Sequence, residues 1–121
     1  MQSAAQAYGK VARQIATPRE LEANLLLRAA ARLQAIRDEW AGRQADLQDA
    51  LLFNRKLWSI LVTSVSSEGN PLPSEIRQNV TNLGIYVMNQ TVATTGEPHP
   101  DKLRPLININ RELAAGLLST G

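Results

Sequence analysis

The sequence predicts an all-α protein, folded as a single-domain antiparallel helical bundle of about five helices. Apolar residues recur at intervals of three and four through most of the 121 residues, which is the spacing of one face of a helix. Proline and glycine gather at a few places between these stretches and indicate short connections. Short connections favour antiparallel neighbours. One domain over residues 1–121 is therefore expected, with one short N-terminal helix and four longer ones.

The first two helices are separated by a well-marked boundary at Thr17. Residues 3–15 carry apolar side chains at helical spacing and predict the short helix. Thr17, Pro18 and Glu20 then supply an N-cap, a first-turn proline and the third residue of a capping box. The long helix that begins there is expected to end at Gly42. Its predicted inward residues are Leu21, Leu25, Leu26, Ala29, Ala30, Leu33, Ile36 and Trp40.

The next helix, over residues 46–66, contains the densest run of large apolar side chains. One of its faces is formed by Leu51, Asn54, Trp58, Leu61 and Val65, and is widened by Leu47, Ala50, Phe53, Leu57 and Ile60. A helix that is apolar over most of its circumference is normally surrounded by neighbours, so this one is the expected centre of the core. Trp58 is expected to pack there, with insertion of a partner helix into a groove as the alternative. Asn54 is the polar exception, which either hydrogen-bonds within the fold or meets a partner.

The second half of the chain predicts two further helices. A glycine and two prolines within residues 66–73 form the clearest break, and a helix follows from Ser74 to about residue 95. Its β-branched residues would also suit a strand, but its apolar face extends over about four turns, which favours helix. Its predicted inward residues are Ile76, Val80, Leu83, Val87 and Thr91. The last helix is expected over residues 101–118, with Leu106, Leu113, Leu117 and either Ile109 or Asn110 inward.

The helix after Ser74 has an unusual composition. Residues 78–96 contain no charged side chain, although many are polar. A solvated helix face usually carries Lys and Glu, whereas the cores of protein interfaces are poor in charge. The segment is therefore expected either to bind a partner or to be buried on two sides of its own bundle. The candidate partner-binding residues of the whole chain are Asn54, Arg55, Trp58, Asn79, Asn82, Tyr86, Asn89 and Gln90.

The composition argues against catalysis and against cofactor or metal sites. The chain has no Cys, no phosphate-binding glycine loop and a single His, His99, which stands between two prolines. We therefore expect no enzyme, no cofactor and no metal. The N-terminus lacks the features of a signal peptide, and no stretch is apolar enough to span a membrane, so a cytoplasmic location is expected.

Nucleic-acid binding is the more serious alternative to protein binding. The net charge is only +2 and aromatic residues make up 4% of the chain, which disfavours a stacking platform for single strands. Acidic residues also interrupt the basic region. RNA is therefore expected as a partner only indirectly, if at all. The arginines of that region are Arg19, Arg28, Arg32, Arg37 and Arg43.

Four segments carry a resemblance to a known family. They are Ala7-Tyr8 followed by Pro-Arg-Glu-Leu-Glu-Ala at 18–23, the run from Ala50 through Asn54-Arg55-Lys56-Leu57-Trp58, Asn-Pro-Leu-Pro at 70–73 with Arg77, and residues 106–117. Together, over nearly the whole chain, they resemble the FlaF family of bacterial flagellar biosynthesis regulators. The resemblance implies a small, cytoplasmic, non-enzymatic helical protein needed for flagellin production and filament assembly.

The resemblance also implies partners. The first is flagellin, which such a protein would bind as a secretion chaperone before export. The second is FlbT, a regulator associated with flagellin mRNA. The alternative function is post-transcriptional regulation of flagellin mRNA, directly or through FlbT. A self-assembling structural protein is a third and weaker hypothesis.

Overall fold

The computed structural model describes residues 17–119, which form four long helices packed antiparallel, joined by turns and loops and without a strand. The all-α bundle predicted from the sequence is thus confirmed, while the short helix predicted for residues 3–15 lies outside the described residues. The long helices are α2 (Pro18–Asp38), α4 (Leu47–Ser66), α5 (Ser74–Gly96) and α6 (Leu103–Ser119). Shorter pieces between them are α3 (Trp40–Arg43) and the 3-10 turns η1 (Gln44–Asp46) and η2 (Pro100–Lys102).

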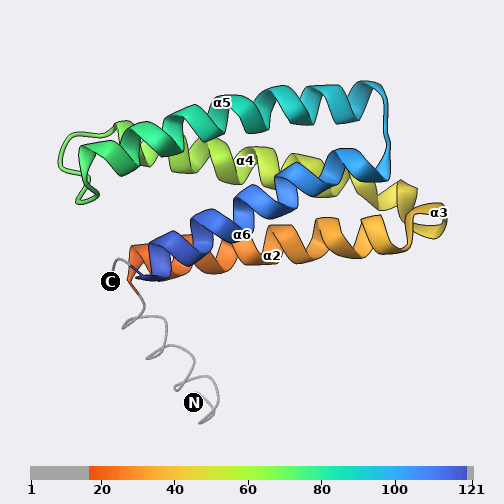
Figure 1. Cartoon of the computed structure of the whole chain (residues 1–121), viewed down its shortest axis with the longest axis horizontal. Coiled ribbons are helices and arrows are strands. Elements are labelled where there is room, and N and C mark those ends of the chain that lie inside the picture. The colour runs from red at the N-terminus through yellow and green to blue at the C-terminus, as the bar shows by residue number, and fades with distance from the viewer. Residues whose placement is uncertain (1–16, 120–121) are drawn as a thin grey trace, which may run out of the picture.

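The long helices are arranged as two pairs (Figure 1). α2 packs along α6, and α4 packs along α5. Contact between α2 and α4 joins the two pairs. α5 and α6 touch only slightly, and they diverge from the short connection that links them. The bundle is therefore closed along three of its seams and open along the α5–α6 seam.

α2 begins at the predicted capping box but ends earlier than predicted. The Glu20 amide donates to Thr17 Oγ1 at 3.1 Å, and the Thr17 amide donates to Glu20 Oε2 at 3.3 Å. The helix ends at Asp38, since Glu39 leaves helical geometry with φ −117° and ψ 41°. The predicted end at Gly42 is wrong, because Gly42 lies within α3. Acidic residues at this carboxyl end oppose the helix dipole, which is consistent with the chain turning there.

Most of the predicted inner face of α2 is confirmed, because Leu26, Ala29, Ala30, Leu33 and Ile36 are buried, but its first turns differ. Leu21 and Leu25 were expected inward but are 44% and 37% exposed, whereas Ala23 is fully buried. Successive helical residues differ by about 100° in direction, so a leucine next to the fully buried Leu26 can fall outside the contact. The small side chains Ala23, Ala29 and Ala30 line the buried face and permit close approach of the packed helices.

α4 occupies the core position predicted for it. All five residues of its predicted inner face are buried, including Trp58 and Asn54, which are fully buried. Ile60, which was expected to widen that face, is 64% exposed. Phe53 is partly buried, with the guanidinium of Arg32 at 6.0 Å from the centre of its ring. The core of α4 is thus narrower than the apolar pattern predicted.

α5 is a helix, as predicted, and follows a loop in which Gly69 adopts φ +84°. Its buried residues form a single stripe along α4: Val80, Gly84, Val87, Thr91 and Thr94. Gly84 permits close contact there, because a Cβ atom at this position would lie 2.5 Å from Val62 Cγ2. Ile76 and Leu83, predicted inward, are only partly buried. In α6 the inward residue is Asn110 rather than Ile109.

Candidate partner-binding surface

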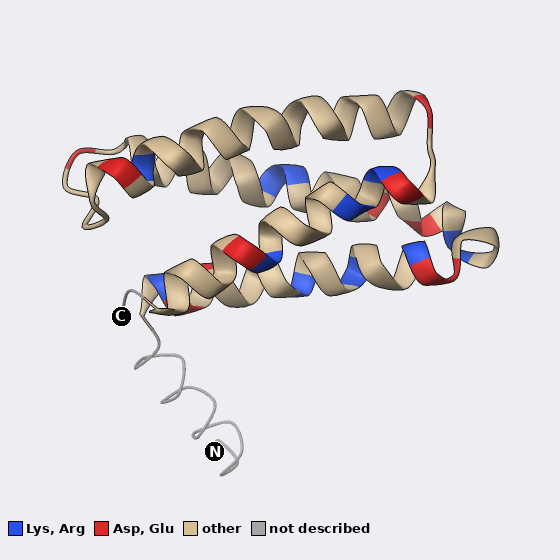
Figure 2. Ribbon diagram, viewed as in Figure 1, with Lys and Arg blue, Asp and Glu red and all other residues tan. Residues whose placement is uncertain are grey.

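After Arg77, the side of α5 that faces away from α4 is exposed and carries no charge. Figure 2 shows no charged residue along α5 between Arg77 and the loop that follows the helix. Three large apolar side chains are exposed on it: Ile85 at 60%, Tyr86 at 44% and Val92 at 72%. Within residues 17–119, α5 is buried along one stripe, so burial in its own bundle does not account for the missing charges.

Five of the predicted binding residues lie on α5. Asn79, Asn82, Tyr86 and Asn89 are exposed, and their spacing of three and four places them on one face of the helix. Asn82 Oδ1 accepts a hydrogen bond from Gln78 Nε2 at 3.1 Å, a contact on the surface. Gln90 lies at the edge of this face. We call the first four residues the amide face of α5.

Asn54 and Trp58 lie inside the bundle, where they join three helices. Trp58 Nε1 donates to Asn110 Oδ1 at 2.9 Å. The amide nitrogen of Asn110 donates to Asn54 Oδ1 at 2.7 Å and to the carbonyl oxygen of Leu26 at 3.3 Å. One asparagine on α6 therefore links α4 to α2, and neither Asn54 nor Trp58 presents surface to a partner in this conformation.

The remaining predicted residue, Arg55, is exposed on α4. It borders a shallow hollow between α4 and α5 that is also lined by Met88 and Val92. The structure therefore separates the residues predicted for binding into a buried pair, an exposed amide face with Gln90 at its edge, and one arginine at a different seam.

A second feature of α5 is a groove along the open seam with α6. It has a volume of about 260 Å³ and is lined mainly by apolar side chains. α5 contributes Ile76, Asn79 and Leu83; α6 contributes Ile109, Glu112, Leu113, Gly116, Leu117 and Ser119. Asn79 belongs both to this groove and to the amide face. The two features therefore form a continuous surface, with an apolar slot beside a row of amides.

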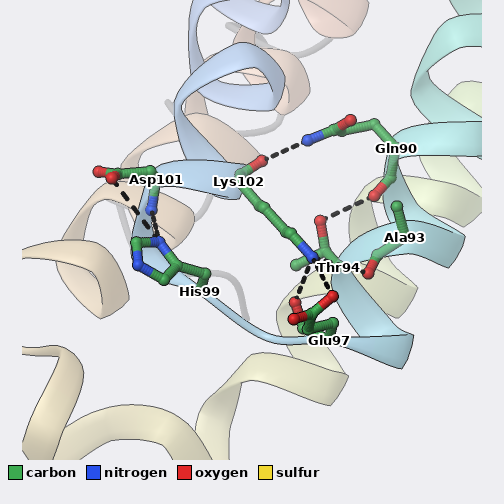
Figure 3. A network of polar contacts seen from close by, with 7 residues as sticks. All are labelled: Gln90, Ala93, Thr94, Glu97, His99, Asp101 and Lys102. Carbon is green, nitrogen blue, oxygen red and sulfur yellow. Dashed lines mark hydrogen bonds and ion pairs between the residues drawn. The ribbon is translucent and has the colours of Figure 1, made fainter.

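The other end of the α5–α6 seam is closed by Lys102 and Gln90 (Figure 3). Lys102 Nζ donates to the carbonyl oxygens of Glu97 at 2.6 Å and Ala93 at 3.5 Å, and lies 3.7 Å from the Glu97 carboxylate. A cation on the last carbonyls of α5 compensates the negative end of its dipole. Gln90 Nε2 donates to the Lys102 carbonyl oxygen at 3.0 Å. These contacts fix the point from which the two helices diverge.

In the predicted basic region, which extends from α2 into α3, two arginines make ion pairs within the fold. Arg37 Nη2 lies 3.8 Å from Asp101 Oδ1, and Arg43 Nε donates to Asp46 Oδ2 at 3.0 Å. Acidic residues alternate with these arginines along the same end of the bundle (Figure 2). The region is thus a mixed surface rather than a basic stripe.

His99 makes a local contact that caps a turn. Its Nδ1 accepts a hydrogen bond from the Asp101 amide at 3.1 Å, where it caps the turn η2 (Figure 3). Residues 17–119 hold no cluster of three His, Asp or Glu side chains that could bind a metal ion. None of the helices in this range combines the length and apolar composition that crossing a lipid bilayer requires.

Sequence reasoning missed three features of this region, and two of them have a local signal. A glycine inside a helical pattern, such as Gly84, indicates close backbone approach. A lysine soon after a helix end, such as Lys102, is a typical C-terminal partner. The hydrogen bonds of Asn110 have no such signal, because its side-chain partners lie 52 and 56 residues away.

Comparison with known proteins gives one match. The family model described as flagellar protein FlaF matches residues 4–117, which is nearly the whole chain. No curated protein and no solved structure matches this chain.

Proposed function

The chain belongs to the FlaF family of flagellar proteins, and we propose that it acts in flagellar biosynthesis as a non-enzymatic chaperone that binds flagellin in the cytoplasm before export. The family gives the role in flagellar biosynthesis. The binding of flagellin is our proposal, and the exposed surface of α5 supports it.

The observation that carries this proposal is the absence of charge on an exposed helix. The amide face and its apolar neighbours Ile85 and Val92 are in solvent, although such composition is typical of interface cores. A filament subunit has interfaces that remain uncovered until it assembles. A surface of amide and apolar side chains suits a protein that covers such interfaces temporarily, because it can bind them without burying a charge.

Calorimetric titration of purified flagellin into the protein tests the proposal. The variant Asn82→Lys/Asn89→Lys places two charges on the amide face and should weaken binding at least tenfold, while the melting temperature stays within a few degrees because both positions are exposed. Asn24→Lys makes one such change at an exposed position of α2 and should bind as the wild type does. Absence of heat with wild-type protein at tens of micromolar would refute flagellin binding.

The alternative function is regulation of flagellin mRNA, directly or through FlbT. The exposed arginines of α2, Arg28 and Arg32, are the residues on which direct binding would depend. Gel-shift measurements with the flagellin leader transcript, with and without FlbT, separate the two functions. The alternative would be favoured if RNA binding weakens steeply with salt and is lost in Arg28→Glu, and if titration of flagellin produces no heat.

A further inference from the structure

A shallow groove follows the outer side of the seam between α4 and α5, which we call the α4–α5 groove. We propose that this groove binds an amphipathic helix of flagellin, whose apolar side chains lie in the groove and whose carboxylate pairs with Arg55. The inference rests on the proposed binding of flagellin and specifies the kind of segment that is bound. It also assigns a role to Arg55, which lies apart from the amide face.

The α4–α5 groove consists of two hollows that meet at Met88. Their volumes are about 320 Å³ and 600 Å³. Along α5 they extend from Thr81 to Gly96, so the groove is about 22 Å long at a helical rise of about 1.5 Å per residue. About four turns of a partner helix would fit along it.

One side of the groove is an apolar ridge on α5. Ile85 is 60% exposed and Val92 is 72% exposed, and Met88 between them is partly buried. Their spacing of three and four residues places them on one face of the helix. Asn82 and Asn89 precede Ile85 and Val92 by three residues, so the ridge borders the amide face. A partner on the amide face can therefore also cover the ridge.

The polar side chains of the groove are hydrogen-bonded within their own helices. Each hydroxyl group that lines it donates to the backbone carbonyl oxygen one turn earlier, at 2.7–3.1 Å: Ser59 and Thr63 on α4, and Thr81, Thr91 and Thr95 on α5. These hydroxyl hydrogens are not available to a partner. An extended peptide would bring backbone carbonyl groups that need donors, whereas a helix pairs its own carbonyls. The groove thus favours a helix over an extended segment.

The charge of the groove is confined to one end. Arg55 is exposed and is the one charged residue among the described residues that line the two hollows. Its guanidinium makes no ion pair with a carboxylate of residues 17–119. A partner that covers the ridge would partly bury this cation, and a carboxylate beside it would offset the cost. A helix with an acidic residue at one end of its apolar stripe is therefore complementary to the groove.

Calorimetric titration of purified flagellin into the full chain tests the role of Arg55. Arg55→Glu should weaken binding about tenfold, because it places a carboxylate where the carboxylate of the partner lies. Lys56→Glu is the matched control, since it makes the same change in net charge at an exposed position that does not line the groove. Lys56 points about 100° away around α4, so its replacement should change binding by less than about twofold.

A second pair of variants tests occupation of the groove. Ser59→Leu adds an apolar side chain inside the groove and should weaken flagellin binding about tenfold by occupying the space of the partner. Ser66→Leu makes the same substitution at an exposed position of α4 that does not line the groove, and it removes the same kind of hydrogen bond. It should bind flagellin as the wild type does. Both serines are exposed, so neither change should lower the melting temperature by more than a few degrees.

Synthetic peptides that cover the flagellin sequence test the chemistry of the bound segment. Overlapping peptides of about 20 residues are long enough to span the groove as a helix. A peptide that binds should gain helical circular dichroism in the complex. Replacing its acidic residues with amides should weaken binding to the wild type but should not weaken binding to Arg55→Gln any further.

The outcomes separate this inference from the proposed function. If Arg55→Glu and Ser59→Leu bind flagellin as the wild type does, while Asn82→Lys/Asn89→Lys binds it weakly, the groove proposal is overturned and flagellin binding stands. Equal weakening by Arg55→Glu and Lys56→Glu would also overturn it, because net charge would then explain the effect. Peptide binding without a gain of helix, or whole flagellin binding when no peptide binds, would exclude a single bound helix. Absence of heat with the wild type would refute both flagellin binding and this inference.

Discussion

Replacing Asn110 with alanine should destabilise the bundle more than replacing Asn54, although both side chains are fully buried. Both changes delete the same atoms and leave cavities of similar size. They differ in the hydrogen bonds lost. Asn110 accepts a hydrogen bond from Trp58 Nε1 and donates to Asn54 Oδ1 and to the Leu26 carbonyl oxygen. Asn54 accepts one bond from Asn110, and its own Nδ2 has no partner among the described residues.

The hydrogen bonds give the size of the difference. The cavity costs about 1 kcal/mol in either variant. Asn110→Ala also leaves Trp58 Nε1 and the Asn54 amide unpaired, at about 1–3 kcal/mol each, so its total is roughly 3–7 kcal/mol. Asn54→Ala leaves Asn110 bonded to Leu26 and Trp58, and its total is about 1–2 kcal/mol. Since domains of this size are stable by about 5–15 kcal/mol, only the first change threatens the fold.

Urea unfolding followed by circular dichroism measures both values, with the slope of the transition as a check that the unfolded state is unchanged. Asn108→Ala is the matched control, because it makes the same substitution on the exposed side of α6 and should cost less than about 0.5 kcal/mol. Equal losses for Asn54→Ala and Asn110→Ala would refute the argument. They would mean that cavity formation, rather than pairing of the buried amide, sets the cost.

Three further changes test other contacts. Gly84→Ala should lower stability by about 1–3 kcal/mol in thermal unfolding, because its Cβ would lie 2.5 Å from a methyl of Val62. Adding Val62→Ala in the same chain should recover most of this loss. If stability does not recover, the clash with Val62 is not the cause. Thr17→Ala removes the capping box of α2 and should cost about 1 kcal/mol in urea, whereas Thr17→Ser should cost little. Lys102→Met should accelerate hydrogen exchange of the Glu97 amide at the end of α5, and unchanged exchange would show that the lysine contributes nothing there.

Residue type and spacing predicted the local elements well because local interactions dominate them. The capping box at Thr17 and Glu20 is satisfied within one turn, so it is readable directly. The break at residues 66–73 depends on the backbone preferences of glycine and proline, again a local property. The errors at Leu25 and Ile60 have a different origin. An apolar side chain is buried only where another helix covers it, and its own helix does not determine that.

The candidate surface was predicted in part. The lack of charge along α5 is visible in sequence, and the structure places Asn79, Asn82, Tyr86 and Asn89 on one exposed face. The groove beside them was not predictable, because it depends on the angle at which α5 and α6 diverge. That angle follows from packing of each helix against a different partner.

The sequence by itself determined the four long helices of residues 17–119, most of their ends and the family, because periodicity, capping and turn residues act over a few positions. Only the tertiary structure decided that Asn54 and Trp58 belong to a buried network centred on Asn110, while the amides of α5 remain in solvent. Both groups are polar or amphipathic residues at helical spacing. What separates them is which face another helix covers, and that is a property of the whole packed bundle.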